Sequence, residues 1–244
     1  MIMKKGIQFL LILALAATLG GCSTVKGWFS KKKPDKPPDV MAEEGIKQLK
    51  KKNYDDAIET FEKVRDRYPY SDQAMLAQIK LADSYFYKKK YDEALQAYKE
   101  FEKLHPTNKG VPYVVYRQGL CYYRQRSTID RDQTYTFKAL EEFRRLKKKY
   151  PQCEYIPNAE KYMAHCRRDL AEHEFYVGEF YFKTKRYKAA LDRFQVVTQE
   201  YPEFPKQAKV KEYIGNCQKE LAEGDKKPES GLLYNITNLF DARW

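Results

Sequence analysis

The sequence lacks the short motifs that mark the common catalytic sites. It contains no G-x-S-x-G, H-E-x-x-H, P-loop or G-x-G-x-x-G pattern. Histidine is scarce as well, with three residues in a chain of 244. His165 and His173 lie eight positions apart, about 12 Å along a helix, which is too far for both to bind one metal ion. We therefore predict a protein without enzyme activity, metal site or cofactor.

The N-terminal apolar run, residues 7–19, is too short for a comfortable transmembrane helix. Two lysines precede it and small residues follow it, which is the layout of a secretory signal peptide. The letters "LGGC" at its end resemble the bacterial lipobox, in which cleavage precedes a cysteine that carries lipid. The resemblance predicts a signal peptide at 1–21 and acyl chains such as palmitate on Cys22. An uncleaved membrane anchor is the alternative.

The residues after Cys22 bear on the compartment and on the partners. Lipoproteins kept in the inner membrane often have Asp after the cysteine, so Ser23 favours the outer membrane, at its periplasmic face. Residues 22–40 are rich in Pro, Lys and Ser and predict a lipidated tether. The net charge of +12 suits acidic proteins or anionic lipid, whereas a periplasmic location excludes nucleic acid.

Cysteine is rare in the rest of the chain, and no C-x-x-C pair occurs. The sequence leaves two alternatives open for the remaining thiols. Several of them lie near apolar helix positions, which favours buried free thiols, but the periplasm also permits one or more disulfides. The four residues concerned are Cys121, Cys153, Cys166 and Cys217.

One pattern occurs four times at identical spacing: an alanine, an aromatic ring four residues later, and a proline twelve residues after the alanine. Four such copies indicate a repeat protein. The alanine and the ring share one helix face, and the proline ends the helix and pushes the residue before it out of helical conformation. The copies are Ala57, Phe61 and Pro69; Ala94, Tyr98 and Pro106; Ala139, Phe143 and Pro151; Ala190, Phe194 and Pro202.

A small residue stands twelve positions before three of these alanines, at Gly45, Ala82 and Gly178. This spacing resembles the tetratricopeptide repeat, in which each unit is two antiparallel helices that approach closely at the small residue, while the ring fills the space beneath. We predict an all-α tetratricopeptide-repeat solenoid of about five helix pairs over 41–223. The last pair is a capping half-repeat with one helix at 205–223.

The third and fourth units depart from the pattern. Gly119 precedes Ala139 by twenty residues, so eight residues are inserted around "STIDRDQTY". The fourth unit opens with a helical pattern over 158–182, which predicts one helix of about 25 residues.

These departures and the lipobox together resemble the BamD family, outer-membrane lipoproteins of the β-barrel assembly machinery. The resemblance covers roughly residues 19–223 and rests on "VPYVVYRQGLCYY", the inserted "DRD", "ALEEFRRLKKKYPQCEYIPNA" and "EFYVGEFYFKTKRYKAAL". It implies a scaffold that binds the periplasmic domains of BamA, works beside other assembly-complex lipoproteins and receives unfolded outer-membrane proteins. The family places substrate on the N-terminal repeats and BamA on the C-terminal repeats.

The candidate site residues follow this division. Rings bind extended peptides at little ordering cost, so the substrate candidates are four tyrosines of the first two units, with packing between repeats as the alternative. Arg193 adjoins Phe194, should point outward and is the candidate anchor for the partner, with a solvated charge as the alternative. The tyrosines are Tyr68, Tyr70, Tyr85 and Tyr87, and the inserted Asp130, Arg131 and Asp132 complete the partner-binding set.

Two other functions remain as alternatives. One is a pilotin-like lipoprotein that escorts a secretin, against which the "DRD" insertion argues. The other is a cell-wall or thiol enzyme, against which the missing motifs argue.

Residues 224–244 are predicted to be a linker and a C-terminal apolar segment. Six large apolar side chains in this segment recur at helical spacing. So many such groups need a groove, on the same solenoid, on a neighbouring subunit or on the assembly partner. They are Leu232, Leu233, Ile236, Leu239, Phe240 and Trp244.

Overall fold

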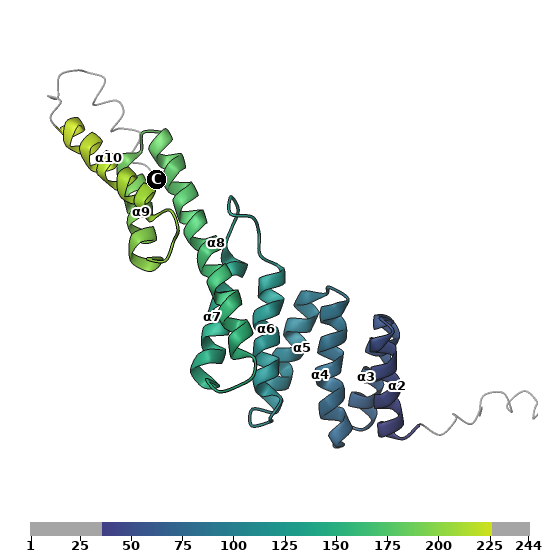
Figure 1. Ribbon diagram of the computed structural model, residues 1–244. Coiled ribbons are helices and arrows are strands. Elements are labelled where there is room, and N and C mark those ends of the chain that lie inside the picture. Colours follow the sequence, from purple (N-terminus) through teal and green to yellow (C-terminus); the bar gives the residue numbers. More distant parts are fainter. Residues whose placement is uncertain (1–35, 226–244) are drawn as a thin grey trace, which may run out of the picture.

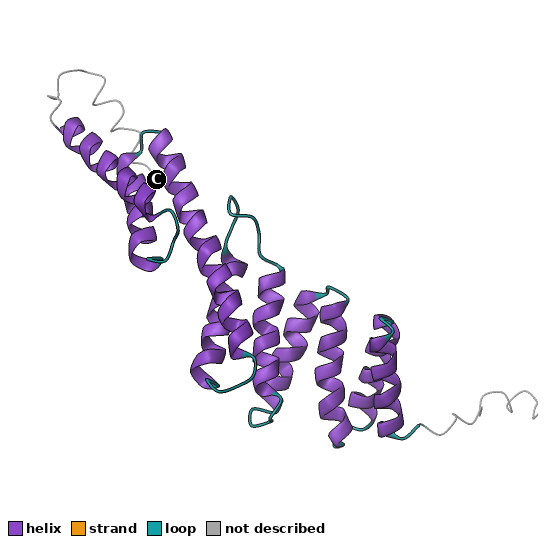
Figure 2. Ribbon diagram, in the orientation of Figure 1, coloured by secondary structure: helices purple, strands orange, loops and turns teal. Residues whose placement is uncertain are grey.

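The computed structural model describes residues 36–225, and every regular element in this part of the chain is a helix (Figures 1 and 2). The predicted all-α class is therefore confirmed. The helices are α2 (Pro38–Lys50), α3 (Tyr54–Arg67), α4 (Asp72–Tyr87), α5 (Tyr91–Leu104), α6 (Val111–Arg124), α7 (Thr134–Lys149), α8 (Ile156–Lys183), α9 (Tyr187–Glu200) and α10 (Gln207–Asp225). The predicted signal peptide, Cys22 and the apolar stripe at 232–244 lie outside the described residues.

Consecutive helices pack side by side along an elongated rod (Figure 1). Four pairs, α2 with α3, α4 with α5, α6 with α7 and α8 with α9, form the repeats, and α10 closes the stack on α9. This arrangement confirms the predicted tetratricopeptide-repeat solenoid with a single helix at its end. The first helix of the described residues, α2, begins at Pro38, three residues before the boundary expected at 41.

The helices of a pair touch most closely where a glycine faces a ring. A Cβ atom added to Gly45, Gly119 or Gly178 would lie 2.6 Å from Cε1 of the opposing phenylalanine ring. These rings are fully buried, so they have no room to yield. In the second unit Ala82 and Tyr98 occupy the same repeat positions, and both are buried. The opposing rings are Phe61, Phe143 and Phe194.

The helix ends also follow the repeat. The residue before each repeat proline caps its helix with φ between −135° and −129°, as the steric effect of proline requires. The turns within three of the units hold a lysine at positive φ, five residues before the repeat alanine. These lysines are Lys52 (φ 64°), Lys89 (φ 65°) and Lys185 (φ 61°).

The long helix α8 divides the solenoid into two offset parts. It has 28 residues against 16 in α7, so it is longer by about 18 Å. Its N-terminal half packs on α7, and its C-terminal half extends beyond α7 and packs on α9 (Figure 1). The hydrophobic core changes at the same point, because one cluster ends at Leu170 and the next begins at Ala171. The single long helix predicted over 158–182 is confirmed.

Candidate binding surfaces

A groove of about 420 Å³ crosses the N-terminal part of the solenoid. Its walls come mainly from α2, α4 and α6, the first helices of three successive pairs. The rings of Tyr54 and Tyr87 stack on one side, with centroids 6.4 Å apart and planes inclined by 17°. Lysines, tyrosines and aliphatic side chains share the lining. The lining residues are Ile46, Leu49, Lys50, Lys52, Tyr54, Lys80, Asp83, Tyr87 and Tyr113.

The carboxylate of Asp83, which is 2% exposed, anchors the floor of this groove. Its Oδ1 accepts hydrogen bonds from the hydroxyls of Tyr98 at 2.6 Å and Tyr113 at 2.7 Å. Its Oδ2 accepts one from Nζ of Lys80 at 3.0 Å. Burial, and then the charge of Asp83, raise the pKa of Tyr113, so its phenol stays protonated and remains a donor at neutral pH. Both oxygens of the Asp83 carboxylate are therefore satisfied.

A buried arginine supports the aromatic wall from behind. The guanidinium carbon of Arg117 lies 3.8 Å from the centroid of the Phe86 ring and 5.1 Å from that of Tyr87. Its Nε donates to the hydroxyl of Tyr98 at 2.9 Å. Stacking of this kind fixes ring orientation, so Tyr87 meets the groove in a defined position.

The structure separates the four tyrosines that the sequence grouped as substrate candidates. Tyr87 lines the groove, and Tyr85 is half-buried with its hydroxyl donating to Glu62 at 3.2 Å. Tyr68 is half-buried at the other end of α4, where its hydroxyl donates to the carbonyl of Lys36 at 3.0 Å. Tyr70 is fully exposed in the turn before α4. The 16 residues of α4, about 24 Å of helix, separate Tyr68 and Tyr70 from Tyr85 and Tyr87. Of the four tyrosines, only Tyr87 lines the groove.

Sequence reasoning missed Lys80, Asp83 and Tyr113. A signal for Asp83 was present, because a carboxylate directly follows Ala82, the small residue at the close-contact position. A charge at such a buried position requires a partner, and Tyr98, the ring of the same unit, provides one.

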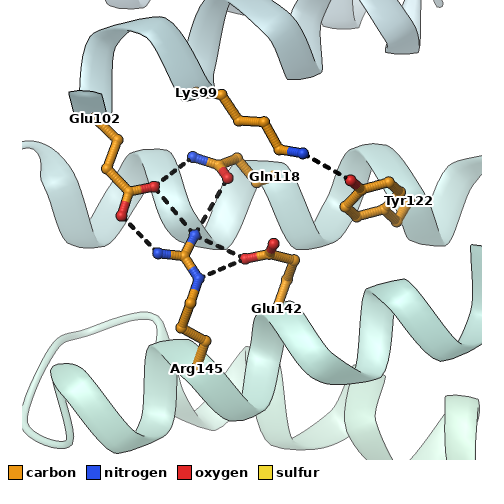
Figure 3. A network of polar contacts seen from close by, with 6 residues as sticks. All are labelled: Lys99, Glu102, Gln118, Tyr122, Glu142 and Arg145. Atoms are coloured by element: carbon orange, nitrogen blue, oxygen red, sulfur yellow. Dashed lines mark hydrogen bonds and ion pairs between the residues drawn. The ribbon is translucent and has the colours of Figure 1, made fainter. Parts of the chain in front are cut away.

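A polar network joins the second helix pair, α4 and α5, to the third, α6 and α7 (Figure 3). Arg145 of α7 contacts Glu102 of α5, through Nη1 to Oε1 at 2.5 Å and Nη2 to Oε2 at 3.1 Å. Gln118 of α6 donates to Glu102 at 2.9 Å and accepts from Arg145 at 3.2 Å. Glu142 pairs with the same arginine at 2.7 Å. Three helices thus share one half-buried cluster, which holds α7 against α5 and α6.

The insertion in the third unit, residues 125–133, is fastened to α8. Arg126 pairs with Asp169 at 3.2 Å, and Nδ1 of His173 lies 2.6 Å from the carbonyl oxygen of Ile129. Within the loop the buried side chain of Gln133 donates to the carbonyls of Thr128 at 2.8 Å and Arg131 at 3.0 Å. The insertion is therefore a fixed feature of the surface beside α8.

The "DRD" triplet sits at the outer edge of this loop, and all three residues are exposed. Asp132 has a structural task, because it accepts hydrogen bonds from the backbone N–H of Thr134 at 2.9 Å and from its hydroxyl at 3.0 Å. These bonds lower the pKa of Asp132 and satisfy the first backbone N–H of α7. Asp130 and Arg131 face solvent from the same loop.

Arg193 on α9 is partly exposed and is held by a carboxylate. Its Nη1 lies 2.9 Å from Oε2 and 3.2 Å from Oε1 of Glu174 on α8. The guanidinium group therefore links α9 to α8. A partner that binds Arg193 would contact an arginine that is already paired with Glu174.

The cysteines of the described part are free thiols, and three of the four are buried. Burial raises the pKa of both Cys121 and Cys166 to about 12. Their thiolates, the reactive form, are thus suppressed at neutral pH. Among residues 36–225 no three His, Cys, Asp or Glu side chains are grouped as metal ligands. Nor does any helix in that range combine the length and the apolar character needed to cross a membrane.

The family profile of YfiO, described as "Outer membrane lipoprotein", matches residues 34–232. The chain belongs to the YfiO family. It is 31% identical over 190 residues to the outer membrane protein assembly factor BamD of Rickettsia prowazekii, covering 78% of this chain and 74% of that protein. The protein of the same name from Buchnera aphidicola is 28% identical over 230 residues, with 86% of this chain and 88% of the relative covered.

The sequence resemblance to this family is confirmed, and the YfiO match spans both the groove and the insertion. Another relative, BamD of Caulobacter vibrioides, is 27% identical over 192 residues, covering 77% of this chain and 61% of the relative. Among solved structures, the TPR2AB-domain:pHSP90 complex of yeast Sti1 is similar at a TM-score of 0.45 and 17% identity. That match covers 75% of this chain and 70% of the solved one.

Proposed function

We propose that this chain is a scaffold of outer-membrane protein assembly and that its N-terminal groove receives unfolded outer-membrane proteins. The stacked rings of Tyr54 and Tyr87 beside three lysines carry this proposal. Membership of a family of outer membrane lipoproteins supports it, as do relatives that are named assembly factors. The names of these relatives do not favour a secretin pilotin.

The chemistry of the groove suits the ends of such substrates. Outer-membrane proteins end in segments rich in aromatic residues, and rings stack on Tyr54, Tyr87 and Tyr113 with little loss of side-chain freedom. Lys50 and Lys52 supply ammonium groups for a carboxylate of the segment, whereas Lys80 already pairs with Asp83 at 3.0 Å and satisfies its charge. An extended, aromatic, anionic segment thus finds complementary groups along one groove.

Peptide binding tests this proposal. Tyr87→Ala removes an exposed ring without opening the core, and we expect it to weaken binding of an aromatic-ended outer-membrane peptide by about tenfold, close to 1.4 kcal/mol. Tyr70→Ala is the matched control, because Tyr70 is fully exposed but lies at the other end of α4. Equal affinities for Tyr87→Ala and the parent, or an equal loss in both variants, contradict a substrate site in the groove.

We propose a second role for the C-terminal half of the solenoid, namely binding of the BamA periplasmic domains and of other assembly-complex lipoproteins. The exposed charges of Asp130 and Arg131, fixed beside α8, support this role, and so does the partly exposed Arg193. Replacing Asp130 and Arg131 by Ala, with Asp132 kept because it accepts a hydrogen bond from the first backbone N–H of α7, should lower the affinity for purified BamA periplasmic domains. An unchanged affinity removes the insertion from that interface.

We also propose attachment to the periplasmic face of the outer membrane through acyl chains on Cys22. Each buried methylene contributes about 0.8 kcal/mol, so several chains on one residue anchor the protein stably. Cys22→Ala should therefore release repeats of normal helicity from the outer-membrane fraction. Continued attachment of that variant through lipid contradicts the anchor.

A further inference from the structure

The C-terminal half of α8 leaves an apolar face uncovered. Tyr176 is 46% exposed and Phe180 is 55% exposed, and four residues apart they lie on one side of the helix. Lower on this side, Asp169 and His173 contact the insertion. The face is therefore covered up to the level of the start of α7 and open beyond it, where α8 extends about 18 Å further.

We propose that the C-terminal apolar segment of the same chain, residues 232–244, packs as a helix on this face of α8. The segment then occupies the position that a longer α7 would fill. Its stripe of leucine, isoleucine, phenylalanine and tryptophan side chains lies against Tyr176 and Phe180.

The length of the segment fits the open face. Thirteen residues, 232–244, make a helix of about 20 Å, close to the 18 Å by which α8 outlasts α7. Such a helix is too short to persist alone in water, so it needs the contact. The contact in turn removes the rings of Tyr176 and Phe180 from water, which stabilises it.

The place where the described chain ends selects this face. α8 and α10 both run antiparallel to α9, so Asp225 lies at the same end of the C-terminal part as the end of α8 (Figure 1). Residues 226–231 reach about 20 Å when extended, enough to pass over α8 from α10 at helix spacings of 8–10 Å. A segment that descends from there runs antiparallel to α8, as α7 does.

The second recess beside α8 is out of reach. It measures about 360 Å³ and lies between the N-terminal half of α8 and the loop before α10, with Met163 and Phe204 in its lining. This recess is at the start of α10, whereas the segment leaves from its end, about 28 Å away along 19 residues. A six-residue linker of about 20 Å does not span that distance.

Tethering favours the same chain as the occupant. A short linker gives an effective concentration in the millimolar range, which is far above that of a second copy in solution.

Tryptophan fluorescence tests the proposal, because the chain has two tryptophans, Trp28 and Trp244. In the mature chain 22–244 with Cys22→Ser and Trp28→Phe, Trp244 is the single reporter. We expect a blue-shifted emission that acrylamide quenches poorly. Phe180→Asp should move emission and quenching to the values of the urea-unfolded chain, with helical circular dichroism retained. Ile236→Asp, on the segment itself, should do the same.

Leu104→Asp is the matched control, because Leu104 is 56% exposed at the end of α5, and it should leave Trp244 unchanged. Three results overturn the proposal. The first is emission of Trp244 in the parent chain at the wavelength of the unfolded chain, which would leave only an external partner. The second is loss of the blue shift on dilution, which would show that the segment packs on a second copy of the chain. The third is a Trp244 that remains blue-shifted in the Phe180→Asp variant, which would place the segment on another surface.

Discussion

Gly178 lies so close to Phe194 that a Cβ atom on the glycine would stand 2.6 Å from Cε1 of the ring. The ring is fully buried, so Gly178→Ala should force α8 and α9 apart and lower the free energy of unfolding by about 1–3 kcal/mol. Urea unfolding measures the loss. Gly215→Ala is the control, because no atom lies within 4 Å of its added Cβ, and better helix propensity should stabilise that variant by up to about 1 kcal/mol. Equal effects at both glycines contradict the close approach.

Lys89 occupies the left-handed region with φ of 65°, where a side chain costs roughly 1–2 kcal/mol. Glycine removes that strain but increases the freedom of the unfolded chain, which offsets about half of the gain. Lys89→Gly should therefore raise the free energy of unfolding by about 0.5–1 kcal/mol. The neighbouring Lys90 has φ of −84°, so Lys90→Gly should bring no gain. Stabilisation by both substitutions would point to an effect of charge instead of backbone strain.

The fold was predictable because its determinants are local and repeated. Gly178 and Phe194 are sixteen residues apart in one unit, and the same spacing recurs at Gly45 and Phe61. Proline similarly sets the conformation of the single residue before it, as at Tyr201. Each of these relationships is confined to one helix pair, so the sequence displays it directly.

The groove was less accessible to sequence reasoning. Tyr85 and Tyr87 are two residues apart, yet one packs toward α3 and the other faces the groove. Which of the two rings faces the groove depends on how α4 is rotated about its own axis relative to the next helix pair. Asp83 meets Tyr113 from thirty residues away, in the following unit. Contacts between units depend on how successive pairs stack, which the repeat pattern does not specify.

Glu102 links stability to pH through its contacts with Arg145. Burial by itself raises the pKa of this carboxyl, but hydrogen bonds from Arg145 and Gln118 outweigh it, and the pKa falls below the ordinary 4.5. A lowered pKa in the folded state gives stability that is present above pH 4.5 and is lost as the pH falls through the folded-state value. Glu102→Gln should cost about 1–2 kcal/mol at pH 7 and progressively less below pH 4.5.

Urea midpoints of the parent and the variant at pH 7 and pH 3 measure this difference. Glu141→Gln serves as the control, because Glu141 makes an exposed pair with Arg144 on the same helix, and exposed pairs contribute little. If Glu102→Gln lowers the free energy of unfolding by the same amount at pH 7 and at pH 3, the ionised carboxylate of Glu102 does not have the stabilising role assigned to it.

Arg193 should contribute to partner binding through its charge, although Glu174 already holds it at 2.9 Å. In the proposed interface, a carboxylate of BamA would displace or share this pair. Arg193→Glu should therefore weaken binding of the BamA periplasmic domains by about tenfold or more, since each factor of ten corresponds to about 1.4 kcal/mol. Glu174→Gln keeps the shape of the pair and releases the guanidinium, so it should leave the affinity unchanged or increase it.

The opposite behaviour of these two variants separates a direct contact from a structural one. If Arg193 acts only by joining α9 to α8, both substitutions break the same link and both weaken binding. Lys188→Glu makes the same change of net charge on the same helix, at an exposed pair with Asp192. Because long-range attraction depends on net charge and is screened by salt, Lys188→Glu should reproduce only the salt-sensitive part of the loss. The part that survives at high salt is then the contact of Arg193 itself, and its absence removes Arg193 from the interface.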